Sequence, residues 1–319
     1  MKYVTGIFGV AVLSFILTFN SACNKKYASS NSPWDSLYLG VDSISFIVMG
    51  DWGKYGGEAQ RPVADAINET SNKFHAQFII TTGDNFYPSG VSSTTDPHWK
   101  LSFEDVYNKE GHQVTWFPVL GNHDYGLNPQ AEIQYSSVSK RWKMPARYYT
   151  VQRNINLLAT ALFVFTDTSP FISSYYGAGM SDLQSQDTAA QLKWLKTTLS
   201  SSRDTWKLVF GHHPVYSVGK HSHTPELIQR FKPVFNQTNT DFYVSGHDHS
   251  LQYITWPRDS VKYLISGGGS EGTYVSPQSY TPFARATPGF MVMTLYTRRA
   301  NVYFYNQRGD LLYRKQIVK

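Results

Sequence analysis

The sequence contains one cysteine, Cys23, among 319 residues. No disulfide can therefore form within the chain, so a folded domain has to be stabilised by its core and by any metals it binds. The chain also lacks a dense run of lysine and arginine, although its formal net charge is +6. A basic balance can attract anionic ligands, but without a concentrated basic segment we do not expect nucleic acid to be a dedicated partner.

The apolar run Ile7–Phe19 is too short to cross a bilayer comfortably. It follows Met1-Lys2 and is followed by small residues that end at Ala22, which is the arrangement of a signal peptide. We therefore predict a signal over residues 1–22, the alternative being a buried helix of the fold. Such a signal predicts an exported protein, and Cys23 stands where bacterial lipoprotein signals are cut and lipidated.

The export prediction has two forms. In the first, a lipid on Cys23 is the protein's contact with a membrane and the protein is an outer-membrane lipoprotein. In the second, cleavage after Ala22 releases it to the periplasm or the medium. We expect the first form, with the second as the alternative, because Asn20 stands where lipoprotein signals usually carry leucine. Residues 23–40 are rich in Ser, Asn and Lys and predict a linker, which leaves residues 41–319 for one large domain.

Strands and helices alternate in the first part of this domain, and strands dominate the last part. Helical spacing of apolar residues appears after Gly57, after Asp187 and again over 227–234, where Pro233 weakens the end. Strands are expected at 261–266, 290–296 and 302–305. The pattern predicts an α/β (α+β, four-layer) domain in which two mixed β-sheets pack as a sandwich flanked by helices.

One sequence pattern occurs five times: an apolar run typical of a strand, then glycine, then a residue of a type that binds metals. Open α/β sheets place their sites beyond the carboxyl ends of their strands, so five such endings predict one polynuclear metal site. A single Gly-Asp after a strand is usually only a turn; five in order are not. The five endings are Gly50-Asp51, Gly83-Asp84-Asn85-Phe86-Tyr87, Gly121-Asn122-His123-Asp124, Gly211-His212-His213 and Gly246-His247-Asp248-His249.

In order and spacing, these endings resemble the motifs of the calcineurin-like metallophosphoesterases. Tyr87, three residues after Asp84, narrows the resemblance to the purple acid phosphatases, and the size of the domain is similar to the small tartrate-resistant form. The likeness extends over nearly all of residues 44–310 and implies the calcineurin-like fold. It implies hydrolysis of phosphomonoesters through attack of a metal-bound hydroxide at a dinuclear, iron-containing centre.

The resemblance also implies which residues bind the two metals. Asp51, Tyr87 and His249 would hold Fe(III), and Asn122, His212 and His247 would hold Fe(II), Zn(II) or Mn(II), with Asp84 bridging the two. A phenolate is a hard anionic donor that suits trivalent iron, which agrees with this assignment. His213 is given no ligand role.

Three further residues are predicted to take part in catalysis. His123 resembles the family histidine that contacts the substrate phosphate or helps to protonate the leaving group, and Asp124 is predicted to orient it. His221, nine residues after His212, is a second candidate proton donor; the alternative is an exposed loop histidine.

Small phosphorylated substrates are the expected partners, including phosphomonoesters and also nucleotides or phosphoproteins. Two alternative functions remain: a phosphodiesterase or nucleotidase with two divalent metals, and a surface binding protein that keeps the site without turnover.

The sequence departs from the mammalian enzymes in two ways. It lacks their disulfide cysteines, and it differs in the loop Ser169–Gln186, which is expected to overhang the site.

Overall fold

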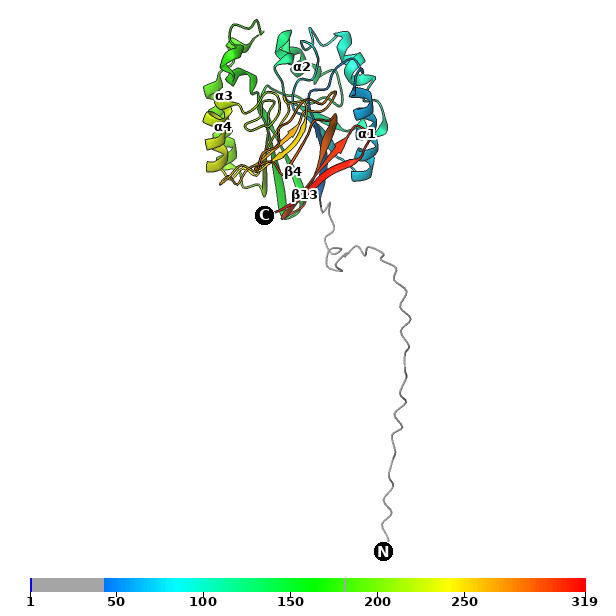
Figure 1. Cartoon of the computed structure of the whole chain (residues 1–319), viewed down its shortest axis with the longest axis vertical. Helices are drawn as coiled ribbons and strands as arrows, with labels where there is room; N and C mark the ends of the chain where they lie inside the picture. The colour runs from blue at the N-terminus through cyan, green and yellow to red at the C-terminus, as the bar shows by residue number, and fades with distance from the viewer. Residues whose placement is uncertain (2–42, 181) are drawn as a thin grey trace. The chain divides into compact units, whose positions relative to one another are not determined.

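A computed structural model describes Met1 and residues 43–180 and 182–319. The described residues from 43 to 319 lie in one compact unit, and the predicted signal (1–22, apart from Met1) and linker (23–40) lie outside the described residues. Within this unit two β-sheets lie between helices, with α1 (Gln60–Phe74) on one side and α3 (Thr188–Ser201) and α4 (Pro225–Gln237) on the other (Figure 1). The predicted arrangement of two mixed sheets flanked by helices is confirmed.

The first sheet has six strands, in which β1, β2 and β3 run parallel and the others antiparallel. In spatial order they are β13 (Leu311–Val318), β12 (Arg299–Asn306), β11 (Gly289–Leu295), β1 (Ile44–Met49), β2 (Phe78–Thr81) and β3 (Thr115–Pro118).

The second sheet has seven strands, and β5, β6, β7 and β9 run parallel in it. In spatial order they are β10 (Phe283–Arg285), β8 (Leu251–Ile254), β9 (Lys262–Ser266), β7 (Phe242–Ser245), β6 (Trp206–Phe210), β5 (Ala159–Phe165) and β4 (Tyr149–Asn156). A short helix, α2 (Pro129–Tyr135), follows β3.

The main core lies between the two sheets. Phe163 of β5 packs edge-on against Phe46 of β1 at a ring-centroid distance of 5.2 Å, and against Phe78 of β2 at 5.3 Å. Edge-to-face contacts of this kind add to the burial of the rings. All six residues of β1 are buried, and five of them are apolar, so the strand does not show the alternation of a half-exposed strand.

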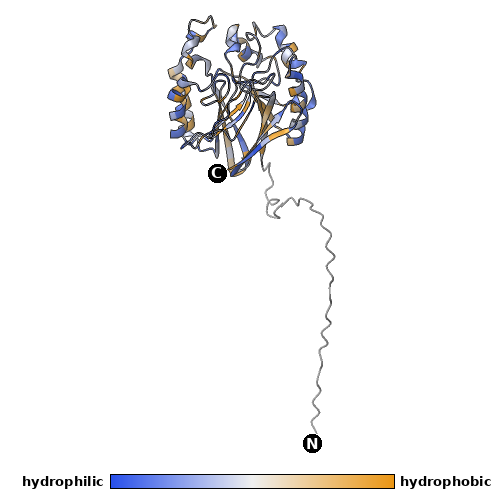
Figure 2. Ribbon diagram, viewed as in Figure 1, coloured by the Kyte–Doolittle hydropathy of each residue, from blue (hydrophilic) through white to orange (hydrophobic). Residues whose placement is uncertain are grey.

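The outer helices cover the sheets with one apolar stripe each. Figure 2 shows hydrophobic and hydrophilic residues sharing these helices. The predicted cap of α3 is confirmed, since the Asp187 side chain accepts a hydrogen bond of 2.9 Å from the Ala190 backbone amide. In α4 the helix continues past Pro233 to Gln237, because Val234 and Phe235 are buried in a second apolar core, which also contains Leu195 of α3 and Val209 of β6. This packing compensates the hydrogen bond that a proline inside a helix loses.

The predicted overhanging loop, Ser169–Gln186, contains short 3-10 turns over Ser169–Phe171, Ser173–Tyr175 and Leu183–Ser185. Among the described residues, no helix is both long enough and apolar enough to span a bilayer.

Candidate metal centre

The five strand endings meet at one edge of the domain. β1, β2 and β3 are parallel neighbours in the first sheet, and β6 and β7 are parallel neighbours in the second. Their carboxyl ends therefore point to the same side, as in other α/β sites. The chain just beyond these ends carries the seven predicted metal ligands: Asp51, Asp84, Tyr87, Asn122, His212, His247 and His249.

The first group of side chains is rich in oxygen. The Tyr87 hydroxyl lies 3.2 Å from Asp51 Oδ1, 3.0 Å from Asp84 Oδ2 and 3.0 Å from His249 Nε2. His249 Nε2 also lies 3.4 Å from Asp51 Oδ1. Two carboxylates, a phenol and one imidazole thus point their donor atoms at the same space.

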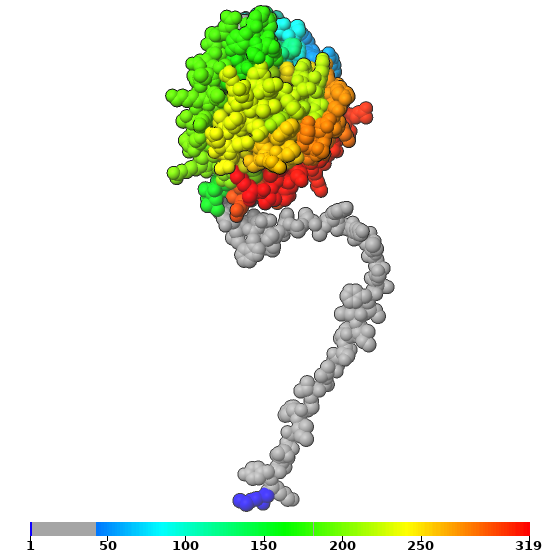
Figure 3. Space-filling model, turned by 60° about the vertical axis from the view of Figure 1, so that its left-hand side comes forward, coloured from blue at the N-terminus to red at the C-terminus, as the bar shows by residue number. Residues whose placement is uncertain are grey.

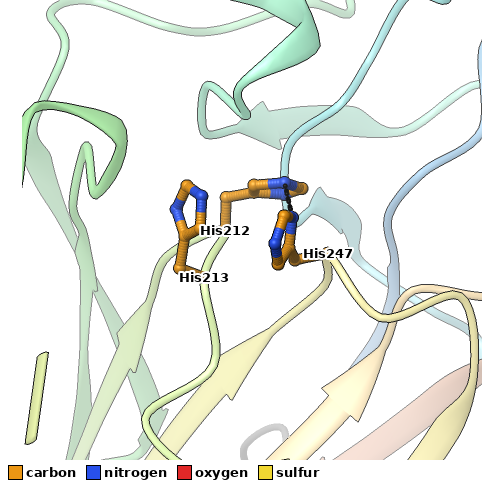
Figure 4. A group of neighbouring side chains, drawn as sticks. All are labelled: His212, His213 and His247. Carbon is orange, nitrogen blue, oxygen red and sulfur yellow. Dashed lines mark hydrogen bonds between the residues drawn. The ribbon is translucent and has the colours of Figure 1, made fainter. Parts of the chain in front are cut away.

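The second group is rich in nitrogen. His212 Nε2 lies 3.0 Å from Asn122 Oδ1 and 3.1 Å from His247 Nδ1. Figure 4 shows the rings of His212 and His247 joined by this contact, with His213 beside them. The two groups meet at Asp84, whose Oδ2 lies 3.0 Å from the Tyr87 hydroxyl and 3.3 Å from His212 Nε2. One carboxylate is therefore available to both groups, as a dinuclear centre requires.

The backbone at the site adopts conformations that are rare for residues with a side chain. Asp51, Asp84 and His247 have φ values of 61°, 48° and 67°. Left-handed conformations of non-glycine residues cost free energy and cluster at functional sites. The loops also approach closely, because a Cβ added to Gly83 would lie 2.7 Å from the Gly121 backbone nitrogen. Glycine after each strand is what lets these loops come together.

Two of the predicted ligand histidines contact, through the ring nitrogen that faces away from the site, groups that fix their ring orientation. His212 Nδ1 is 2.8 Å from the Thr82 carbonyl oxygen, so its Nε2 faces the site. His249 Nδ1 contacts Glu271, whose other oxygen accepts a 2.8 Å hydrogen bond from Lys54. Such partners orient metal-binding histidines and raise their basicity. The sequence analysis missed Glu271, although it follows β9 and the glycines at 267–269, a sixth strand ending of the same type.

The buried carboxylates of this cluster favour the binding of cations. Burial would lower the pKa of His212, but the neighbouring Asp84 carboxylate outweighs it and raises the pKa to about 9. Burial likewise opposes the shift at His249, where Asp51 and Glu271 raise the pKa to about 9. Burial together with Asp51 and Asp84 raises the pKa of Tyr87 well above its ordinary value. In the metal-free chain, protons on these two imidazoles therefore balance the negative charge of the carboxylates, and metal ions would take over that role.

Further geometry supports a fit of this cluster to metal ions. The side chains of Asp51, Asp84 and His212 are buried, and their donor atoms lie within 4.8 Å of one another. Carboxylate, phenol, amide and imidazole groups match the ligand types of a mixed iron and divalent-metal centre. The residues present therefore fit a dinuclear centre.

Asp124 does not lie where the sequence analysis expected it. Its buried carboxylate accepts hydrogen bonds from the backbone amides of Gly121 (2.8 Å), Asn85 (2.9 Å) and Phe86 (3.1 Å). The His123 ring instead contacts the Pro88 carbonyl oxygen. Asp124 thus ties together the loops that carry Asp84 and Asn122, because three convergent amides are better partners for a buried carboxylate than a half-exposed ring.

The two candidate proton donors lie at the mouth of the site, near opposite groups of ligands. His123 packs on the Tyr87 ring at a centroid distance of 4.4 Å, and its Nε2 is 3.9 Å from Asp84 Oδ2. His221 is exposed and packs on His247 at 4.2 Å. The site thus has one imidazole beside each group.

His213 belongs to a triad with His212 and His247 that is close enough to hold a metal. Both of its ring nitrogens, however, have side-chain partners: Thr168 Oγ1 at 2.8 Å and the Tyr175 hydroxyl at 2.8 Å. This favours its exclusion from the ligand set. It also makes His213 the point at which Tyr175, in the overhanging loop, is fixed to the site.

Comparisons with known proteins agree with this geometry. The model of the calcineurin-like phosphoesterase family matches residues 44–251. "Purple acid phosphatase 17" of Arabidopsis thaliana is 34% identical over 288 residues, covering 85% of this chain and 83% of the relative. "Tartrate-resistant acid phosphatase type 5" of Homo sapiens is 29% identical over 298 residues, covering 87% and 91%.

Solved structures give the same fold. A structure titled "GAP50 the anchor in the inner membrane complex of Plasmodium" has a TM-score of 0.77 at 25% identity and covers 87% of this chain and 89% of that one. The purple acid phosphatase PPD1 from yellow lupin (Lupinus luteus) seeds has a TM-score of 0.64 at 12% identity, covering 86% of this chain and 54% of that one.

Proposed function

The chain belongs to the purple acid phosphatases of the calcineurin-like phosphoesterase family, and on this premise we propose how it hydrolyses phosphomonoesters and with which metals. It is an acid phosphatase with a dinuclear metal centre. The finer assignments are the identity of each metal, the role of each residue and the location of the protein.

The position of Tyr87 carries the proposal. Its hydroxyl lies 3.0 Å from both Asp84 Oδ2 and His249 Nε2 and 3.2 Å from Asp51 Oδ1, so two hard, anionic carboxylates lie beside it. A phenolate in such surroundings suits Fe(III). We assign Fe(III) to Asp51, Tyr87 and His249, and Fe(II), Zn(II) or Mn(II) to Asn122, His212 and His247, with Asp84 contributing to both.

When bound, the two metals supply an activated water and neutralise charge on the phosphoryl oxygens. The protein's own residues do the rest. His123 and His221, at the mouth of the site, are placed to bind the phosphate and to give a proton to the leaving oxygen. Asp124 holds the loops of Asp84 and Asn122 together through its three amide contacts, which keeps the ligands in place.

Substrates are small phosphorylated molecules, and we include nucleotides and phosphoproteins among the candidates. A diesterase with two divalent metals would have no use for a tyrosine among its ligands, and Tyr87 therefore argues against it. A binding protein without turnover would not need imidazoles at the mouth of the site. We further propose that the chain is exported through residues 1–22 and that Cys23 carries a lipid, on the sequence pattern alone.

The deciding experiment measures initial rates on an aryl phosphomonoester and on the matched diester between about pH 4 and about pH 8. Preference for the monoester with an acid optimum, together with a purple colour of the iron-loaded protein, is the expected result. Preference for the diester near neutral pH would replace the proposal by the diesterase alternative. Metal-loaded protein that turns over neither substrate would favour the binding protein.

A further inference from the structure

The end of the domain opposite the metal centre holds a cavity. Its volume is about 400 Å³. The strands that carry predicted metal ligands at their carboxyl ends begin beside it. Among the residues that line it, Thr205 directly precedes β6, Lys207 lies at the start of β6, and Asn239 precedes β7. His212 lies seven positions after Thr205, so at about 3.3 Å per strand residue roughly 23 Å separate the cavity from the metal centre.

The cavity is basic. In the part of the chain that the structure describes, its walls include four cationic side chains, those of Arg203, Lys207, Arg298 and Lys319, and one acidic one, that of Asp204. Lys207 is held by two backbone carbonyls and Lys319 by Asp241. Arg203 and Arg298 are exposed at the rim, so their guanidinium groups are placed to meet an anion arriving from solvent.

The hairpin turn next to this cavity is hydrophobic. Leu157 and Leu158 form the turn between β4 and β5, and their exposed fractions are 91% and 77%. Asn156 at the foot of the turn donates a 2.6 Å hydrogen bond to Thr297, which lines the cavity. Gln152 of β4 likewise donates to Asp204 at 2.7 Å. Hairpin turns usually carry glycine or polar residues, so two largely exposed leucines at this turn are unusual.

The first described strand, β1, begins at the same end of the domain. β1 begins at Ile44, which pairs with Leu295 at the end of β11, three residues before Arg298. The apolar run 7–19 and Cys23 therefore precede a domain whose first strand starts at the basic end. Figure 3 shows the C-terminal residues, in red, gathered at one end of the described domain.

We propose that this end, the basal surface formed by Leu157, Leu158, Arg203, Arg298 and Lys319, docks on a bilayer that contains anionic phospholipid. Arg203 and Arg298 bind headgroup phosphates at the mouth of the cavity, and the two leucines enter the boundary with the acyl chains. A basic and apolar combination of this kind is what peripheral membrane surfaces use.

Docking in this way has a consequence for catalysis. The metal centre lies at the far edge of the same strands, so its mouth opens away from the bilayer toward soluble substrates. The docking surface shares no residue with the metal centre, and it neither requires nor alters the phosphatase reaction. It also needs no acyl chain on Cys23, although one there would act in the same direction, because stable anchoring commonly combines two signals.

The test uses the full chain with Cys23→Ser, which removes the acylation site and the competing thiol. A single cysteine is introduced by Leu158→Cys and carries an environment-sensitive fluorophore. The matched control carries it at Val138→Cys, an exposed apolar position three residues after α2. Figure 1 shows α2 at the end of the domain opposite β13. Vesicles of phosphatidylcholine with phosphatidylglycerol are compared with vesicles of phosphatidylcholine alone.

We expect a blue shift for the label at residue 158 with the anionic vesicles and none at residue 138. Each basic residue near an anionic leaflet changes affinity about fivefold, so Arg203→Gln with Arg298→Gln should weaken the titration at residue 158 by roughly 30-fold. Phosphatase activity of the unlabelled arginine variants should be unchanged, which keeps this proposal separate from the proposed function.

Three results would overturn the docking proposal: no shift at residue 158, equal shifts at residues 158 and 138, or a titration that the arginine substitutions leave unchanged. A dimer that dissociates on Leu157→Ser with Leu158→Ser would instead assign the surface to a second copy of the chain. If the unsubstituted protein bound the anionic vesicles but hydrolysed no phosphomonoester, the result would count against the phosphatase function alone.

Discussion

The two halves of the candidate centre share one carboxylate but differ in nearly everything else. Asp51, Tyr87 and His249 offer mainly anionic oxygen, whereas Asn122, His212 and His247 offer neutral nitrogen and an amide. Hard anionic donors favour a trivalent ion and imidazoles a divalent one. Neighbouring strands that end in different residue types can therefore provide two unlike sets of candidate ligands at one edge of the domain.

The strongest way to break this comparison is to remove what both halves share. Asp84→Asn keeps the size of the side chain but removes its charge, so both metals should be lost together and the phosphomonoester rate should fall by at least about a thousandfold. Metal content by mass spectrometry and initial rates check it, with Asp105→Asn, an exposed carboxylate paired with Lys100, as the control. Retention of two metals with near-normal rates would contradict the shared role of Asp84.

Tyr87→Phe removes the donor that makes the first half distinctive. The ring is buried against His123 and should keep its packing, while the hydroxyl is lost. We expect the visible absorption of the iron-loaded protein to disappear entirely while the second half retains its metal. The absorption spectrum and metal content check this. A variant that stays purple would show that the colour comes from another group and would remove Tyr87 from the ligand set.

His221→Ala tests the imidazole beside the second half. Proton donation to a leaving group typically contributes about a hundredfold or more, and only where the leaving oxygen is basic. The rate on an alkyl phosphate should therefore fall by about a hundredfold, while the rate on an activated aryl phosphate changes little. Lys220→Ala, at the neighbouring exposed position, is the control. Equal losses on both substrates would point to a structural role for His221.

Much of this centre was predictable from the sequence, for a physical reason. Each predicted ligand stands within a few residues of a strand end, and parallel strands in order bring those ends together, so local spacing was enough to predict which side chains meet. Side chains that act across the fold were harder to predict. The partners of Asp124 are amides from two different loops, and its neighbour in sequence, His123, was the wrong partner to choose.

The same limit applied to the fold. Pro233 was expected to weaken the end of its helix, but buried neighbours carry α4 on to Gln237. The hairpin of β4 and β5 places Leu157 and Leu158 beside the β11–β12 turn through one contact, between Asn156 and Thr297. That contact joins residues 141 positions apart, a separation that local periodicity does not encode.

The smallest expected effect concerns the groups behind the two halves. His212 is held by a backbone carbonyl, which no substitution removes, whereas His249 is held by Glu271, a side chain that also binds Lys54. Glu271→Gln keeps a hydrogen-bond acceptor but removes the charge, so metal affinity in the Tyr87 half should fall by about tenfold. The second half should keep its affinity.

The matched control for this prediction is Glu58→Gln. Glu58 accepts a 2.8 Å hydrogen bond from the same Lys54 but, unlike Glu271, is an exposed partner in an i,i+4 pair, and exposed pairs contribute little. Competition with a chelator, followed through the visible band, measures the affinity of the Tyr87 half directly. If both glutamate variants weaken metal binding equally, the effect belongs to the charge on Lys54, whose ammonium lies 5.1 Å from the Tyr87 ring centroid. If only Glu271→Gln does, the carboxylate acts through His249, and the two halves differ in how their ligands are held as well as in which ligands they use.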